Sequence, residues 1–140
     1  MIKSLLLFVS IILLSGCMPV KKEEIYGKYL VEFPFGSQTL KLNRDGTYEQ
    51  IVIITWNADT TRHNGKWKYS DNYTYILLFN GLSVVDPYCS LRTNYKIPID
   101  GIVVAAPIQY LPWFTISLTT GCEEYYYKQI EYFPDTSSTE

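Results

Sequence analysis

Residues 40–56 have the sequence LKLNRDGTYEQIVIITW, in which two apolar runs flank a short polar segment. The polar segment, residues 43–46, ends in Gly46, which adopts positive φ without steric cost and therefore suits a hairpin turn. The run that follows it is rich in β-branched and aromatic residues, which favour strands. The stretch therefore predicts two antiparallel strands, residues 38–42 and 47–56, joined by a tight turn.

The same pattern continues to residue 132. Short β-branched and aromatic runs are separated by turn signals at the spacing that is typical of an all-β sandwich or barrel. Residues 57–65 are predicted to form a polar loop, and Asn80-Gly81 and Asp100-Gly101 are predicted to form hairpin turns. The other predicted strands are residues 25–32, 66–70, 73–79, 82–85, 94–99, 102–105, 113–119 and 124–132.

Several predicted strands are apolar on both faces. Along residues 47–56, Val52 and Ile54 share one face, whereas Ile51 and Ile53 share the other. A sheet with one solvated face would alternate more cleanly between apolar and polar residues. We therefore expect an all-β fold, a small antiparallel β-barrel or half-barrel of about 8–10 strands.

The first sixteen residues have the composition of an export signal. A short cationic start containing Lys3 precedes an apolar segment, residues 4–14, whose length lies within the range of about 7–15 residues for such signals. A helix that spans a membrane needs about 20 apolar residues. The sequence therefore predicts a signal helix over residues 1–16 ahead of the β domain.

The end of this segment resembles the lipobox of bacterial lipoproteins. Leu14-Ser15-Gly16-Cys17 has the required order of an aliphatic residue, two small residues and a cysteine. The resemblance implies that the Cys17 thiol carries a diacylglyceryl group and that the chain is cut before Cys17. Two acyl chains are enough for stable anchoring. Residues 17–24 would then be the lipidated N-terminus and tether, residues 25–133 the β-barrel domain, and residues 134–140 a flexible tail.

This resemblance also implies a location. The protein would be exported and held by its lipid in the outer membrane, on the periplasmic face, of a Gram-negative cell, or on the outer face of a Gram-positive cell membrane. Position 18 is Met, whereas Asp at this position marks retention in the inner membrane of enteric Gram-negative bacteria.

The body of the chain resembles small lipocalin-like bacterial lipoproteins. The resemblance is carried by residues 26–29 (YGKY), 40–48 (LKLNRDGTY), 65–67 (GKW) and 125–127 (YYY). It implies a lipocalin-like barrel. Lipocalins carry Gly-x-Trp in their first strand, whereas in this chain that motif falls at residues 65–67.

Cysteines and aromatic residues supply the remaining candidate sites. If Cys17 is lipidated, Cys89 and Cys122 form an even pair, which in an exported domain indicates a disulfide; two separate thiols are the alternative. The chain contains 13 tyrosines. Aromatic side chains could line a pocket for an apolar ligand or a sugar, or could simply fill the interior of a small barrel. The candidate pocket residues are Trp56, Trp67, Tyr125 and Tyr127.

The sequence offers little for catalysis. His63 is the only histidine and lies in the predicted polar loop, whereas nucleophilic triads and zinc sites need a histidine with further partners. We expect no catalytic residue, no metal and no cofactor. A formal charge of −2 without a basic cluster argues against nucleic acid as a partner.

The expected function follows from the expected location. The chain is predicted to be a lipid-anchored cell-envelope protein that acts as a non-enzymatic binding or interaction module. Its partners would be the membrane, through the lipid on Cys17, and either a small apolar ligand or an envelope protein. The alternative is an envelope inhibitor or immunity-type protein that acts on a protein partner, and a hydrolase is a more distant possibility.

Overall fold

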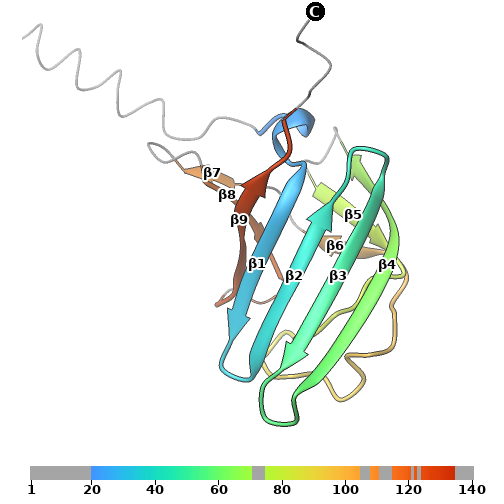
Figure 1. Ribbon diagram of the computed structural model, residues 1–140, viewed down its shortest axis with the longest axis vertical. Helices are drawn as coiled ribbons and strands as arrows, with labels where there is room; N and C mark the ends of the chain where they lie inside the picture. Colours follow the sequence, from blue (N-terminus) through green and yellow to red (C-terminus); the bar gives the residue numbers. More distant parts are fainter. Residues whose placement is uncertain are drawn as a thin grey trace, which may run out of the picture.

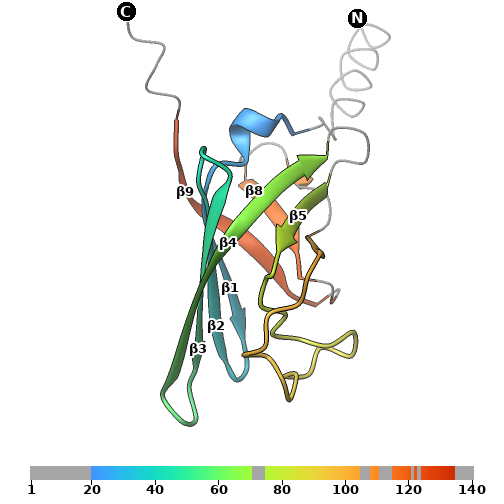
Figure 2. The same cartoon turned by 90° about the vertical axis from the view of Figure 1, so that its right-hand side faces the viewer.

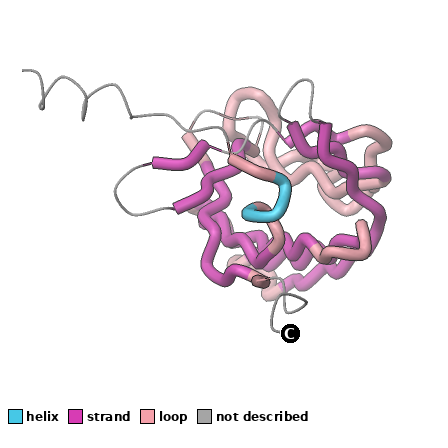
Figure 3. The backbone as a smooth tube through the Cα atoms, turned by 90° about the horizontal axis from the view of Figure 1, so that it is seen from above, coloured by secondary structure: helices cyan, strands magenta, loops and turns pink. Residues whose placement is uncertain are grey.

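The computed structural model of the protein is an antiparallel β-sheet that curls into a half-barrel (Figures 1 and 3). The structure describes residues 20–70, 75–104, 108–110, 115–120, 122 and 124–134. In these residues the only helical segment is a 3-10 turn, η1 (Lys22–Glu24). The prediction of an all-β half-barrel is therefore confirmed, whereas the predicted signal helix lies outside the described residues.

The described strands form one sheet with the order β6-β5-β4-β3-β2-β1-β9-β8-β7. Strands β1 to β5 each pair with the next strand in sequence, and β1 also pairs with β9. Among the described residues no ladder joins β6 to β7, so this sheet has two edges. The strands are β1 (Gly27–Phe33), β2 (Gly36–Leu42), β3 (Thr47–Ile54), β4 (Asp59–Ser70), β5 (Tyr75–Phe79), β6 (Ile102–Val104), β7 (Ile108–Tyr110), β8 (Thr115–Thr119) and β9 (Tyr126–Tyr132).

The hairpin predicted around residues 43–46 is present. Strands β2 and β3 pair from Gly36–Ile54 to Leu42–Tyr48, and Gly46 has a φ of 82°. The Asp45 carboxylate accepts a hydrogen bond from the Thr47 backbone N–H at 2.9 Å, which fixes the turn. Along β3 every second residue is buried, so one face of the strand lines the interior of the half-barrel.

The prediction of a polar loop over residues 57–65 is wrong. Residues 59–65 belong to β4, which pairs with the whole length of β3 and continues to Ser70, and only residues 57 and 58 lie in the turn before it (Figure 1). Thr61, His63 and Gly65 are less exposed than the residues between them, which face solvent. The polar composition suggested a loop. In the structure the backbone N–H and C=O groups form hydrogen bonds in the ladder with β3, and the outer polar side chains form theirs with solvent.

The predicted strands 82–85 and 94–99 are also wrong. The dipeptide Asn80-Gly81 does not form a hairpin between strands, because β5 pairs with β6. Residues 80–101, which we call the closing segment, instead leave the sheet and lie on the same side of the β1–β4 strands as β5 and β8 (Figure 2). Ile99 forms an isolated bridge with Gly81, so Asp100-Gly101 is not a hairpin between two strands either.

The closing segment is fixed from inside the half-barrel by Gln50. The Leu82 backbone N–H donates a hydrogen bond to Gln50 Oε1 at 2.7 Å, and Gln50 Nε2 donates one to the Leu82 carbonyl at 3.2 Å. Leu82, Val84 and Val85 are buried in the core. The amide of one buried side chain thus replaces a strand partner for this backbone.

Two further contacts hold the closing segment at its outer part. Cys89 and Cys122 form a disulfide with a Cα–Cα distance of 5.4 Å, within the usual range of about 4.4–6.8 Å, so the predicted pairing is confirmed. Tyr95 donates a hydrogen bond from its hydroxyl to the Asp59 carboxylate at 2.6 Å, and Lys96 pairs with the same carboxylate.

Val20, the first residue that the structure describes, is already packed against the core, ahead of the domain start expected at residue 25. Val20 is 4% exposed, and its carbonyl accepts a hydrogen bond from the Tyr69 hydroxyl at 3.3 Å. Ile25 is fully buried, and η1 lies across one end of the curled sheet (Figure 3). Residues before position 25 therefore contribute to the core.

Removing the disulfide should destabilise the domain. The bond joins residues separated by 33 positions, for which the chain-entropy model gives about 3–4 kcal/mol of unfolding free energy. We expect the double variant Cys89→Ser and Cys122→Ser to lose about this much, measured by urea unfolding followed through tryptophan fluorescence. Dithiothreitol should lower the midpoint of the wild type and leave that of the variant unchanged. Equal midpoints for the wild type with and without reductant would contradict the assignment.

Candidate functional site

Large side chains occupy the interior of the half-barrel. Tyr29 and Tyr48 are almost completely buried, and their hydroxyls donate hydrogen bonds to the Ile25 carbonyl at 2.6 Å and the Phe79 carbonyl at 2.9 Å. Burial raises the pKa of Tyr48 to about 12. Burial also raises the pKa of Tyr29, and a hydrogen bond from Gln129 opposes part of that rise. These tyrosines are core residues with satisfied hydroxyls.

A small polar cluster lies within this core. Gln38 on β2 and Gln50 on β3 are buried, and both contact the buried hydroxyl of Tyr127 on β9. Burial raises the pKa of Tyr127 above its ordinary value. Gln38 Nε2 has no hydrogen-bond partner among the described residues. The cluster therefore links β2, β3 and β9 across the interior.

The four candidate pocket residues do not share one pocket. Trp56 is 64% exposed and follows the end of β3, whereas Trp67 is buried and donates a hydrogen bond from Nε1 to the Asn43 carbonyl at 3.0 Å, beside the start of β3. Tyr127 belongs to the polar cluster, and Tyr125 lies outside it. The two tryptophans thus mark opposite ends of the sheet.

Trp56 and Tyr125 are instead connected through a chain of aromatic rings. The Trp56 ring lies 6.2 Å from Phe35, Phe35 stacks on Phe33 at 5.0 Å, and Phe33 meets Tyr125 edge to face at 5.0 Å. These distances lie within the range at which aromatic pairs stabilise a fold. The chain joins the β1–β2 and β3–β4 connections to the start of β9.

The pairing between β1 and β9 stops partway along β1. It runs from Gly27 to Leu30, with an irregularity between Lys28 and Tyr29, and the last pair is Leu30–Lys128. Beyond that point β9 pairs with β8 on its other side. A β-bulge increases the local twist of a strand, so the irregularity between Lys28 and Tyr29 is expected to twist β1 more strongly at this point. The end of β1 therefore has no ladder partner on this side among the described residues.

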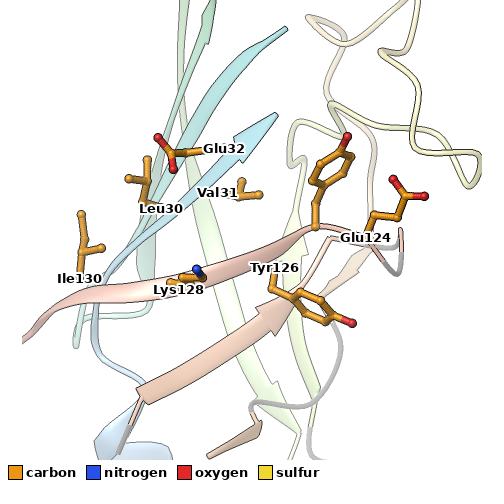
Figure 4. Close-up of a pocket in the computed structure, with 8 residues that line it drawn as sticks. Leu30, Val31, Glu32, Glu124, Tyr126, Lys128 and Ile130 are labelled. Atoms are coloured by element: carbon orange, nitrogen blue, oxygen red, sulfur yellow. The ribbon is translucent and has the colours of Figure 1, made fainter. Parts of the chain in front are cut away.

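A pocket of about 300 Å³ opens where the two strands separate (Figure 4). We call it the β1–β9 groove. Two of its large apolar side chains are accessible to solvent, since Tyr126 is 42% and Ile130 is 54% exposed. Charged residues of both signs accompany them. The labelled lining residues are Leu30, Val31, Glu32, Glu124, Tyr126, Lys128 and Ile130.

Of the four predicted pocket residues, only Tyr125 lines the β1–β9 groove, and the sequence identifies only part of the interior. Gln50 occupies an inward position of β3 between Tyr48 and Val52, so strict alternation along this strand would have identified a buried amide. The groove depends on pairing between β1 and β9, which are separated by most of the chain. No local pattern encodes such a pairing.

The described residues contain no arrangement that suggests catalysis or metal binding. No group of three His, Cys, Asp or Glu side chains in this part of the chain could hold a metal ion. His63 faces the interior from β4, with its ring 6.3 Å from the ring of Tyr48, and its Nε2 has no hydrogen-bond partner among the described residues. This histidine has an aromatic neighbour where a catalytic histidine would need a carboxylate or a nucleophile.

The predicted lipidation site, Cys17, lies outside the described residues. Within the described part of the chain, no helix has the length and apolar character needed to cross a membrane.

The buried tyrosines predict a loss of stability at alkaline pH. Their pKa values are raised in the folded protein above the value of about 10 for an unfolded chain, so their contribution is fully present below pH 10 and is lost as the pH rises above it. We expect the midpoint of urea unfolding to fall above pH 10. The substitution Tyr127→Phe should make this fall shallower.

The control for this prediction is Tyr88→Phe, because Tyr88 is 89% exposed. It should leave the pH profile unchanged. Identical profiles for the wild type and Tyr127→Phe would show that the Tyr127 hydroxyl is not buried as described.

Comparison of the chain with models of protein families, with curated proteins and with solved structures finds no match. The functional argument therefore depends on the residues and geometry of this chain.

Proposed function

We propose that this protein is a lipid-anchored cell-envelope protein that acts as a non-enzymatic interaction module and binds a protein partner at the β1–β9 groove. The observation that carries the proposal is a groove with exposed apolar side chains on the outside of a half-barrel in which large side chains of the described residues are buried. A carrier of small apolar ligands would be expected to enclose a ligand in its interior. Here Tyr29, Tyr48 and Tyr127 occupy that space.

The groove has the composition of a protein interface. Leu30, Tyr126 and Ile130 supply an apolar centre, and charged residues surround it. Interfaces combine an apolar core with a polar rim and are enriched in tyrosine. The unpaired side of β1 beyond Leu30 also offers backbone groups to an extended segment of a partner, as in strand addition.

Export and anchoring are supported by the chemistry of the cysteines. The lipobox resemblance assigns Cys17 to lipid, and the remaining two cysteines form a disulfide, which persists in oxidising compartments outside the cytosol. The location remains the one expected from the sequence, the outer membrane of a Gram-negative cell or the outer face of a Gram-positive cell membrane. In this proposal the lipocalin-like body is a half-barrel whose binding site is a groove on its surface and not a ligand site in its interior.

An inhibitor or immunity-type protein is the second candidate. The same groove favours it, because such proteins also act by occupying a partner's surface through exposed apolar and charged side chains. The two candidates differ in the partner: a resident envelope protein for the first, and a toxin or an enzyme that reaches the envelope for the second.

Site-specific crosslinking in cells tests the proposed interface. A photoreactive amino acid placed at Tyr126 in the full chain should give a discrete adduct, because this side chain lies in the groove. The matched control is the same amino acid at Ile53, which is comparably exposed on β3, outside the groove. The adduct should disappear with Ile130→Glu in the same chain. Adducts at neither position, or equal adducts at both, would contradict the proposal, and the mass of the adduct distinguishes the two candidates.

The anchor has its own control in the same cells. Globomycin, which blocks the peptidase that cuts lipoprotein precursors, should cause the uncut precursor to accumulate, and Cys17→Ser should release the domain from the membrane. If globomycin does not change the processing of the precursor and Cys17→Ser does not release the domain, the lipid anchor is contradicted. The crosslinking result at Tyr126 still tests the proposed interface, because it does not depend on the anchor.

A further inference from the structure

The outer face of β4 carries a row of cations. Arg62, Lys66 and Lys68 occupy alternate positions with Asn64 between them, and all four side chains are exposed. Alternate residues of a strand lie on one face, so the three cations extend over about 20 Å at roughly 3.3 Å per residue. We call this row the β4 stripe. It becomes visible only because residues 57–65 form a strand instead of a loop.

The charge of the β4 stripe is largely uncompensated. Among the described residues, no ion pair joins Arg62, Lys66 or Lys68 to a carboxylate. Glu49 on β3 lies opposite Asn64 and brings one negative charge beside three positive ones. Asp45, in the β2–β3 turn, directly follows Arg44 in the sequence. The stripe therefore presents a net positive surface.

An apolar border accompanies the stripe on β5. Leu77 pairs with Lys68 and Phe79 pairs with Lys66, so both side chains face the same side of the sheet as the cations. Phe79 is 38% exposed and Leu77 is partly buried. Figure 2 shows β4 and β5 side by side along this face. Cations next to apolar side chains are the combination that binds anionic lipid surfaces.

The start of the packed domain lies at the end of the same strand. The Val20 carbonyl is hydrogen-bonded to Tyr69, the residue that follows Lys68. Cys17 precedes Val20 by three residues, which span at most about 11 Å when fully extended. An acylated Cys17 thus holds the end of β4 close to the bilayer. Charges at such distances still act on each other, because the screening length is about 8–10 Å at physiological salt.

We propose that the β4 stripe, with Leu77 and Phe79 beside it, docks the domain on an anionic phospholipid surface. This inference rests on the proposed lipid anchor at Cys17, which brings the stripe to the membrane. Docking would fix the orientation of the domain, and it would leave the β1–β9 groove free, since β3, β2 and β1 lie between β4 and β9 in the curled sheet.

Lysine labelling of the membrane-bound protein tests the proposal. The full chain, purified from membranes as cells produce it, is placed in nanodiscs of phosphatidylcholine with or without phosphatidylglycerol and acylated with an amine-reactive reagent. The acylation rate of each lysine is measured by mass spectrometry. Lys66 and Lys68 should react about fivefold more slowly in the anionic discs, a factor set by the attraction of one cation to such a surface, and high salt should abolish the difference.

Lys128 is the internal control, because it is exposed on β9 and borders the groove. Its rate should be the same in both kinds of disc. Equal rates for Lys66, Lys68 and Lys128 in the two discs, on a chain whose mass shows lipid on Cys17, would overturn the membrane face alone. An unmodified Cys17 in the same mass spectrum would overturn the anchor, and with it this inference.

Two charge-reversal variants distinguish the effect of the β4 stripe on membrane docking from the effect of the protein's net charge. Energy transfer from tryptophan to a labelled lipid headgroup should rise in anionic discs for the wild type and for Lys41→Glu with Lys128→Glu. It should not rise for Lys66→Glu with Lys68→Glu. Circular dichroism and the thermal midpoint verify that both variants fold. If the Lys66→Glu, Lys68→Glu variant does not fold, the variant Lys66→Gln with Lys68→Gln takes its place in the experiment. Equal loss of transfer in both variants would overturn the assignment to β4.

Discussion

The side-chain amide of Gln50 supplies both hydrogen bonds that a strand partner would give to Leu82, inside the curl of the sheet. This pairing turns the closing segment inward, so that Val84 and Val85 join the core. Without it, a buried N–H and a buried carbonyl would have no partner, which typically costs about 1–3 kcal/mol. The disulfide between Cys89 and Cys122 then ties the same segment to the region before β9.

Because large side chains of the described residues are buried inside the half-barrel, the candidate recognition surfaces lie on its outside. Tyr29, Tyr48 and Tyr127 are core residues, and the hydroxyls of Tyr29 and Tyr48 donate hydrogen bonds to backbone carbonyls. Two outer surfaces differ from the rest. The β1–β9 groove combines apolar side chains with the end of β1, which has no ladder partner on the β9 side among the described residues, and the β4 stripe combines cations with an apolar border. They lie on different parts of the sheet, which allows one to face a membrane while the other faces a partner.

The parts of the fold that the sequence predicts are those that local chemistry determines. Gly46 and Asp45 encode the β2–β3 turn, and the alternation along β3 encodes its buried face. The predicted strand over residues 66–70 is part of β4, whereas residues 59–65 of β4 were expected to be a loop, because their polar side chains lie on a strand that is stabilised by a ladder with β3. The path of the closing segment was not predicted because it depends on hydrogen bonds to the side-chain amide of Gln50, which is distant in the sequence. The groove depends on β1 meeting β9, and no pattern within either strand specifies where that pairing ends.

Hydrogen exchange of the Gln50→Ala variant tests whether Gln50 holds the closing segment against the core. Exchange measured by mass spectrometry should become about 10- to 100-fold faster in residues 80–91 than in the wild type, while β2 and β3 keep their protection, because only the segment loses its partner. Glu49→Ala, an exposed neighbour on the same strand, should leave exchange in that segment unchanged. Equal exchange of residues 80–91 in the wild type and Gln50→Ala would contradict the account.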